Sequence, residues 1–191
     1  MGIFPLCFTF AAHFKNEVDM DVFFAYSIPI QGLKVGIHSY RYALDREFFS
    51  HFEGSPIGTA DVACNLTLDK RPDMLVLDFE MGGWIEAECD RCTALIHLPL
   101  QAERQLLVKY GEQEGETEDE VVFIPRESSS FNVAKYLYEF AVLAMPITNT
   151  YACEEDDPRP CNQEILKYLS NESAANENGS VWDTLKDLNK N

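Results

Sequence analysis

Four cysteines are the residues of this chain best suited to chemistry. Cys89 and Cys92 are separated by two residues, and Cys153 and Cys161 follow far downstream with seven residues between them. Two thiolates spaced like the first pair can bind one zinc ion from a tight turn, and a second pair can complete a tetrahedral site. We therefore expect one of two arrangements. Either all four cysteines bind zinc, or the first pair are reduced thiols at a strand turn and the second pair lie in a polar loop.

A thiol redox function is the alternative use of Cys89 and Cys92. Redox dithiols stand at a helix N-terminus, which stabilises the thiolate, whereas both flanks of this pair have strand patterns. His97 is the nearest histidine, but a strand would carry it away from the turn. The chain has no glycine-rich phosphate loop, Gly-x-Ser-x-Gly elbow or His-Glu-x-x-His helix. We expect a protein that is not an enzyme.

The charge of the chain limits its partners. It has 191 residues, 32 Asp and Glu against 15 Lys and Arg, and a net charge of -17. Such a field repels phosphate backbones, so it disfavours extensive nucleic-acid contact and favours a basic protein partner. The acidic run at residues 111–120 is either a solvated loop or a partner-binding surface. Its candidate partner-binding residues are Glu116, Glu118, Asp119 and Glu120.

The use of cysteine and the N-terminal residues bear on the cellular compartment. Six cysteines in a chain of this length do not indicate a disulfide scaffold, and cysteines that stay reduced suit the cytoplasm. No apolar run reaches the ~18 residues of a membrane span. Residues 3–14 are mostly apolar, yet the first basic residue, Lys15, follows them, which is the wrong order for an export signal. We expect residues 1–19 to be an extension from an upstream start codon, with Met20 as the true start.

The remaining residues, 20–191, predict one α+β domain. Alternating apolar and polar residues indicate strands at 22–30, 37–44, 60–68, 75–81, 84–88, 94–100, 104–109 and 121–124. Asp45 predicts the cap of a short helix, and Gly82-Gly83 permits a bend. The strands should form a strongly bent, barrel-like antiparallel meander.

Helical spacing replaces alternation after Phe131. We expect the main helix at 133–144, capped by Asn132, and a short helix at 162–169. Residues 171–180 are polar, and a final amphipathic helix runs over 181–188. Its Trp182 either docks on the chain's own domain or anchors a partner.

Several blocks of sequence together resemble one bacterial family. They are Tyr26–Ile30 with Gly32–Gly36, Asp45–Phe49, Cys89–Cys92 with Pro99, Tyr138–Phe140 with Leu143–Pro146, Cys161, and Trp182–Leu188. Their order and spacing are similar to those of the YceD family, the large ribosomal RNA subunit accumulation proteins.

The resemblance implies a non-enzymatic role in the synthesis, processing or accumulation of large-subunit ribosomal RNA during ribosome assembly. The partner would be a basic ribosomal protein or a pre-ribosomal particle. Any RNA contact would be local, through a small basic patch that could include Arg91, Arg104 and Lys109. Family members carry a histidine where this chain has Tyr151, so Cys153 would have to replace it as the fourth zinc ligand.

Overall fold

The computed structural model describes residues 22–111, 121–153 and 156–175. Within them a five-stranded sheet has the order β2 (Gly36–Asp45), β3 (Ala60–Lys70), β4 (Met74–Glu88), β5 (Leu95–Tyr110) and β6 (Val121–Ile124). The first four strands pair antiparallel, and β6 pairs parallel to the end of β5. A second sheet joins β1 (Ser27–Ile28) to β7 (Phe131–Asn132). The α+β class and the bent meander are confirmed, although the sheet is not closed into a barrel.

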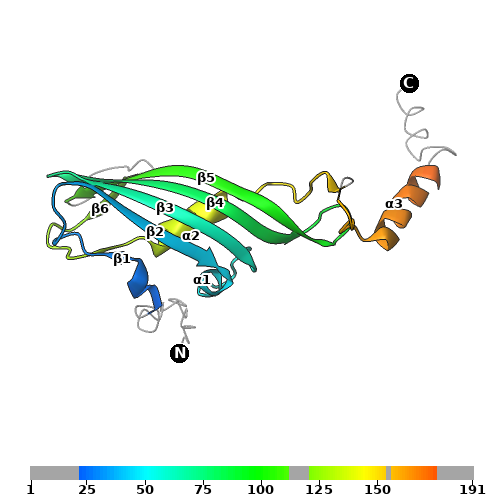
Figure 1. The fold of residues 1–191 in the computed structure, drawn as a ribbon, viewed down its shortest axis with the longest axis horizontal. Coiled ribbons are helices and arrows are strands. Elements are labelled where there is room, and N and C mark those ends of the chain that lie inside the picture. The colour runs from blue at the N-terminus through cyan, green and yellow to red at the C-terminus, as the bar shows by residue number, and fades with distance from the viewer. Residues whose placement is uncertain (1–21, 112–120, 154–155, 176–191) are drawn as a thin grey trace, which may run out of the picture.

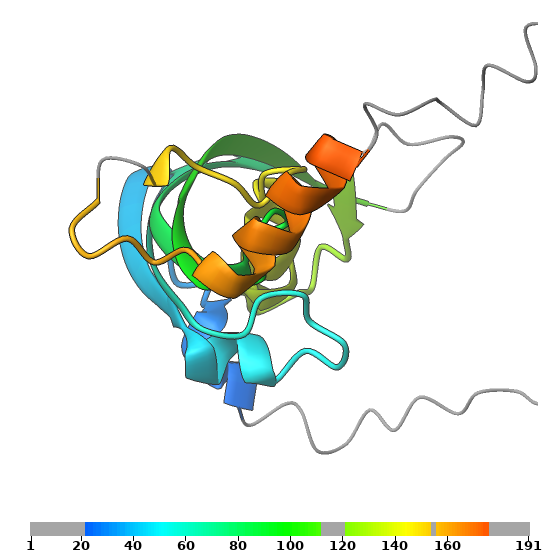
Figure 2. The ribbon, with the colours of Figure 1, turned by 90° about the vertical axis from the view of Figure 1, so that its right-hand side faces the viewer.

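The concave face of the large sheet forms the core. Along β3 and from Leu77 to Met81 of β4, buried residues alternate with more exposed ones, as a sheet with one face in the core requires. Helix α2 (Ala134–Leu143) lies inside the curl of the strands (Figure 1), and Figure 2 shows the sheet wrapped around it. Leu137 and Ala141 of α2 are fully buried, and the Phe140 ring meets that of Phe79 on β4, with 5.1 Å between centroids. These contacts hold α2 against the sheet.

Gly83 allows the paired strands β3 and β4 to approach closely. It pairs with Val62 on β3, and a Cβ atom at Gly83 would stand 2.1 Å from the Asp61 carbonyl oxygen. At Gly82, nothing lies within 4 Å of the same added atom. The pairing of β3 with β4 runs through both glycines without a bulge. The bend predicted here is therefore a close approach of two backbones, which only glycine permits.

The sequence predicted one of two short helices and missed the other. Helix α1 (Arg46–Ser50) begins as predicted, because Asp45 accepts a hydrogen bond from the Phe48 backbone N–H at 3.0 Å. Residues 22–30, predicted to be extended, instead begin with a 3-10 helix, η1 (Val22–Tyr26). Its Phe23 ring packs on Phe52, with 5.2 Å between centroids. Aromatic packing on residues distant in sequence therefore decides the local backbone.

The caps and lengths of the later helices also needed correction. The N-cap of α2 is Val133, not Asn132, although the Asn132 side chain still accepts a hydrogen bond from the Ala134 N–H at 2.9 Å. Helix α3 (Gln163–Ala175) runs six residues beyond the predicted end at 169. None of the helices in the described residues is long and apolar enough to cross a membrane.

Candidate metal centre

The turn between β4 and β5 presents the first two cysteines. The Cys89 backbone N–H donates to the Ala94 carbonyl, and the Thr93 N–H donates to the Cys89 carbonyl, each at 2.8 Å. Thr93 adopts a φ of 55°, the left-handed conformation that reverses the chain. Cys89 and Cys92 are consequently both buried, at 6% and 2% exposure. The strands predicted on both sides of this turn are confirmed, and the pair does not stand at a helix N-terminus.

All four predicted cysteines meet at this turn. The thiols of Cys89 and Cys161 lie close enough to the Cys92 thiol to lower its pKa. The sulfurs of Cys161 and Cys153 are 2.7 Å apart. The four thiols therefore lie near one another, although 60 residues lie between Cys92 and Cys153 in the sequence. Cys64, by contrast, is fully buried within β3 and is not one of the contacts of this group.

The backbone around Cys92 favours a thiolate there. The N–H of Ala94, and after it that of Asn162, lower the pKa of the Cys92 thiol, against the opposing effect of burial. The neighbouring Cys161 behaves oppositely, because its hydrogen bond with Cys153 raises the pKa of the Cys161 thiol to about 11. One sulfur surrounded by N–H donors and linked to further thiols is the arrangement found around metal-bound cysteines.

Asp90 and Asn149 fasten the downstream segment to the turn, a role that the sequence did not reveal. The Asp90 N–H donates to the Asn149 carbonyl at 3.1 Å. In return the Asn149 N–H donates to the Asp90 carboxylate at 2.7 Å. This reciprocal pair lies four residues before Cys153 and so brings that cysteine back to the turn. An acidic residue between two cysteines was the one available signal.

The thiols are gathered but not yet in metal-binding geometry. Among the described residues, no three His, Cys, Asp or Glu side chains already surround a common metal position. Two thiolates at ~2.3 Å from one tetrahedral zinc would be ~3.8 Å apart, so the 2.7 Å between Cys153 and Cys161 would have to widen by about one ångström. The four thiols are soft donors of the number that a structural zinc site uses, but in the described residues they do not surround one metal position.

The other residues considered as ligands lie outside the sulfur group. His97 is exposed and stacks on Trp84, with ring centroids 4.0 Å apart, and its Nε2 lies 3.9 Å from the Glu86 carboxylate. The Tyr151 hydroxyl donates to Asp156 at 2.5 Å, and this hydrogen bond raises the pKa of Tyr151 to about 12. A phenol so occupied does not replace the family's histidine as a ligand.

The proposed partner-binding residues are scattered. Arg91 is exposed at the cysteine turn, whereas Lys109 lies at the far end of β5. Arg104 stands between them on the same strand, so the three cations do not form one patch. Glu116, Glu118, Asp119, Glu120 and Trp182 fall outside the described residues, as do the extension 1–19 and the helix 181–188.

Comparison with known proteins identifies the family of the chain. The sequence model of a family described as "Large ribosomal RNA subunit accumulation protein YceD" matches residues 77–189, more than half of the chain. The chain belongs to the YceD family. The match spans all four cysteines of the centre, while the blocks at residues 26–49 lie outside it. No curated protein and no solved structure matches the chain.

Proposed function

We propose that this YceD-family chain is a non-enzymatic factor that supports the accumulation of large-subunit ribosomal RNA by binding a basic ribosomal protein or a pre-ribosomal particle. The family's description supplies the biological process. The net charge of -17 supports the class of partner, because an acidic surface steers a cationic protein toward it. The acidic residues 112–120 and Trp182 are the proposed contact surfaces.

The four-cysteine centre has a structural role in this proposal. Cys89, Cys92, Cys153 and Cys161 would hold one zinc ion, which would supply a cross-link between the β4–β5 turn and the segment that leads into α3. The observation that carries this assignment is the proximity of the four thiols at one turn. A site with four protein ligands leaves no open position for a substrate, so the metal would stabilise the fold and take no part in catalysis.

A thiol redox enzyme is the second candidate, favoured by the lowered pKa of Cys92. A catalytic dithiol must expose the attacking sulfur to a disulfide substrate. Cys92 is 2% exposed and Cys89 is 6% exposed. Burial of both thiols in the turn between two strands therefore favours the structural role over the redox role.

Purification of the tagged chain with its partners tests the binding function. Mass spectrometry and RNA sequencing of the captured material should show large-subunit proteins together with large-subunit ribosomal RNA, and a charge-neutralised 112–120 variant should capture less. Recovery of no ribosomal component, together with turnover of a disulfide substrate by the purified chain, would refute the binding function and establish the redox one.

Elemental analysis of protein purified without chelator tests the metal. We expect close to one zinc per chain, a large loss of zinc in Cys161→Ser, and no loss in the control Cys64→Ala, which changes a cysteine outside the centre. Trace zinc in the unmodified chain would refute the assignment, and the 89–92 segment would then be only a tight turn.

A further inference from the structure

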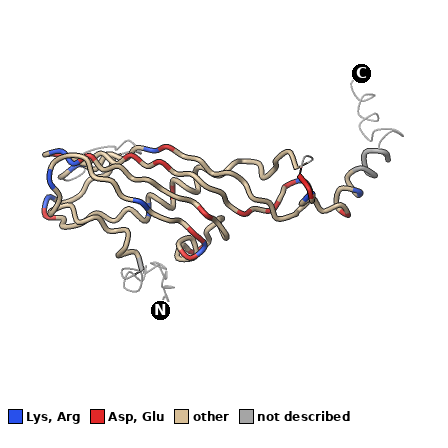
Figure 3. The backbone as a smooth tube through the Cα atoms, viewed as in Figure 1, with Lys and Arg blue, Asp and Glu red and all other residues tan. Residues whose placement is uncertain are grey.

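A pocket at the end of the sheet opposite the cysteine turn has a charge unlike that of the rest of the chain. Its volume is about 310 Å³, and its lining contains three cations, Lys70, Arg71 and Arg126, and no carboxylate. Lys34 and Lys109 adjoin two other lining residues, Val35 and Tyr110, in the sequence. Figure 3 shows Lys and Arg residues gathered at this end. Three of the chain's 15 cations therefore line one opening.

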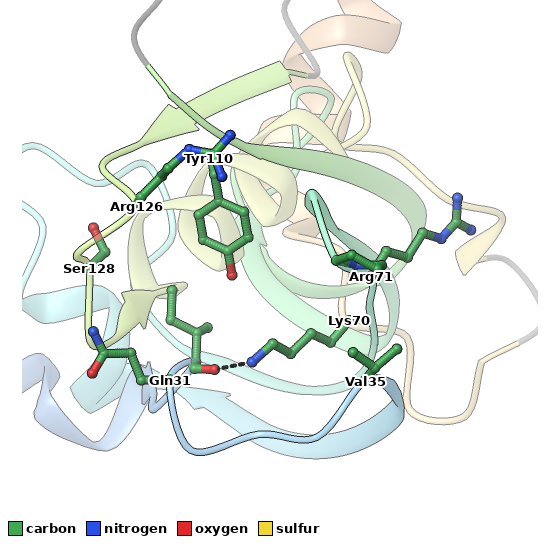
Figure 4. Close-up of a pocket in the computed structure, with 9 residues that line it drawn as sticks. Gln31, Val35, Lys70, Arg71, Tyr110, Arg126 and Ser128 are labelled. Atoms are coloured by element: carbon green, nitrogen blue, oxygen red, sulfur yellow. Dashed lines mark hydrogen bonds between the residues drawn. The ribbon is translucent and has the colours of Figure 1, made fainter.

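Lys70 is held in place with one N–H to spare. Its ammonium donates to the carbonyl oxygens of Ile30, at 2.6 Å, and Leu33, at 2.8 Å. These two bonds fix the ammonium without neutralising its charge, since carbonyls carry no formal charge. An ammonium has three donors, so the third remains for a ligand. In Figure 4 the Lys70 ammonium and the Tyr110 hydroxyl both point toward the middle of the pocket.

The remaining lining groups complete a set of donors. Arg126 lines the side of the pocket away from Lys70, and within the described residues neither forms an ion pair with a carboxylate. Burial raises the pKa of Tyr110, so its hydroxyl stays a proton donor at neutral pH. Arg71 contributes less, because it extends away in Figure 4 and pairs with Asp69 at 2.8 Å.

The acidic groups near the pocket weaken its positive electrostatic potential, but none of them lines the pocket. Among described residues they are Asp69, which is paired with Arg71, and the exposed Asp73 and Glu127. Gln31 donates to the backbone carbonyl of Glu127 at 3.1 Å and so orders that loop. The two donors that point inward in Figure 4, the Lys70 ammonium and the Tyr110 hydroxyl, are a cation and a hydroxyl, which suit recognition of a phosphate group.

We propose that this pocket binds a phosphodiester group of single-stranded RNA, with Lys70 and Tyr110 as donors to the phosphate oxygens and Arg126 as a flanking cation at the rim. The inference rests on the proposed function, because it supplies the local RNA contact through which an acidic chain could engage a ribosomal particle. A volume near the lower end of the ~300–1,000 Å³ typical of ligand sites suits one nucleotide unit of a strand. The contact positions the strand and reads no base sequence.

Fluorescence anisotropy with a labelled single-stranded oligouridine, over a series of salt concentrations, tests the proposal. Arg126→Gln should weaken binding severalfold and reduce the slope of log K against log salt by about 0.7, the value for one phosphate contact on a single strand. Tyr110→Phe should weaken binding without changing that slope. Arg104→Gln, which removes an exposed cation from the middle of β5 and matches the change in net charge, should alter neither quantity.

Three results would overturn the proposal. They are no RNA binding at low salt, equal effects of Arg126→Gln and Arg104→Gln, and binding of inorganic phosphate or a mononucleotide as tight as that of the RNA. The last result would identify the ligand as a free phosphate compound. Co-sedimentation with large-subunit particles separates this failure from failure of the proposed function. Particles that retain the chain without RNA binding would refute the pocket alone, and loss of particle association by the unmodified chain would refute the proposed function.

Discussion

Gly83→Ala should destabilise the fold far more than the adjacent change Gly82→Ala. The added methyl carbon would lie 2.1 Å from the Asp61 carbonyl oxygen and 2.7 Å from the Val62 Cα. Both are backbone atoms of the paired strand β3, so no side chain can rotate away. The strands would have to separate by about one ångström to restore van der Waals contact, and forced backbone shifts of this kind cost roughly 1–3 kcal/mol.

Two opposing contributions set the net magnitude. Replacement of glycine by alanine stabilises a compatible site by about 0.4–1 kcal/mol through the unfolded chain. At Gly83 this gain offsets part of the clash, and we expect a net loss of about 2 kcal/mol at the upper end of the overpacking range. At Gly82 nothing lies within 4 Å of the new atom, so the gain should remain and the variant should be neutral or slightly more stable.

Thermal and urea unfolding of both variants, measured with metal content held equal, provides the assay. For a domain of this size, about 2 kcal/mol corresponds to a fall in Tm of roughly 4–8 °C. Equal stabilities of the Gly82→Ala and Gly83→Ala variants would show that β3 and β4 do not approach as closely as described. The direction of the cysteine turn, which β4 carries, would then need revision.

Further predictions concern the cysteines and the charges. Cys161→Ser should lower the free energy of unfolding by several kcal/mol in the zinc-loaded protein but by much less after chelation, because zinc binding contributes folding free energy, and calorimetry with and without chelator checks this. Burial raises the pKa of the Cys64 thiol to about 12. A thiol whose pKa is higher in the folded than in the unfolded protein stabilises the fold at pH values below its unfolded pKa. This stabilisation is lost as the pH rises toward the folded pKa. Between pH 8 and 10 the unmodified chain should therefore lose about 1 kcal/mol more than Cys64→Val, as urea titrations would show. Replacement of the acidic residues in 112–120 by Gln and Asn should slow association with a basic partner and flatten its salt dependence, measurable by stopped flow, while Tm stays nearly unchanged.

Local patterns were sufficient to predict most of the strands and one helix start. The alternation along 60–68 and 75–81 reports a sheet with one buried face, and Asp45 caps α1 through a bond to a residue three positions away. These features depend on neighbours in the sequence, so a sequence can reveal them. The 3-10 conformation of 22–26 depends on Phe52 and Tyr42, which stand beside it only in the folded chain.

The candidate metal centre was also predictable from the sequence only in part. The spacing of Cys89 and Cys92 marks a two-thiol turn directly, whereas the sequence left open whether the later pair joins this turn or lies in a polar loop. What brings Cys153 to the turn is the reciprocal bonding of Asp90 with Asn149, 59 residues away, and the sequence does not show that these two residues meet. The cationic pocket is similarly hidden, because Lys70, Tyr110 and Arg126 come from three separate ends of strands.

The ratio of large-subunit to small-subunit ribosomal RNA in cells depleted of this chain tests its central role most directly. We expect the ratio to fall on depletion and to recover when the unmodified chain is resupplied. The charge-neutralised 112–120 variant, produced at the same level, should restore it less well. An unchanged ratio after complete depletion would contradict the account, because a factor that supports accumulation of large-subunit RNA cannot be lost without effect on it.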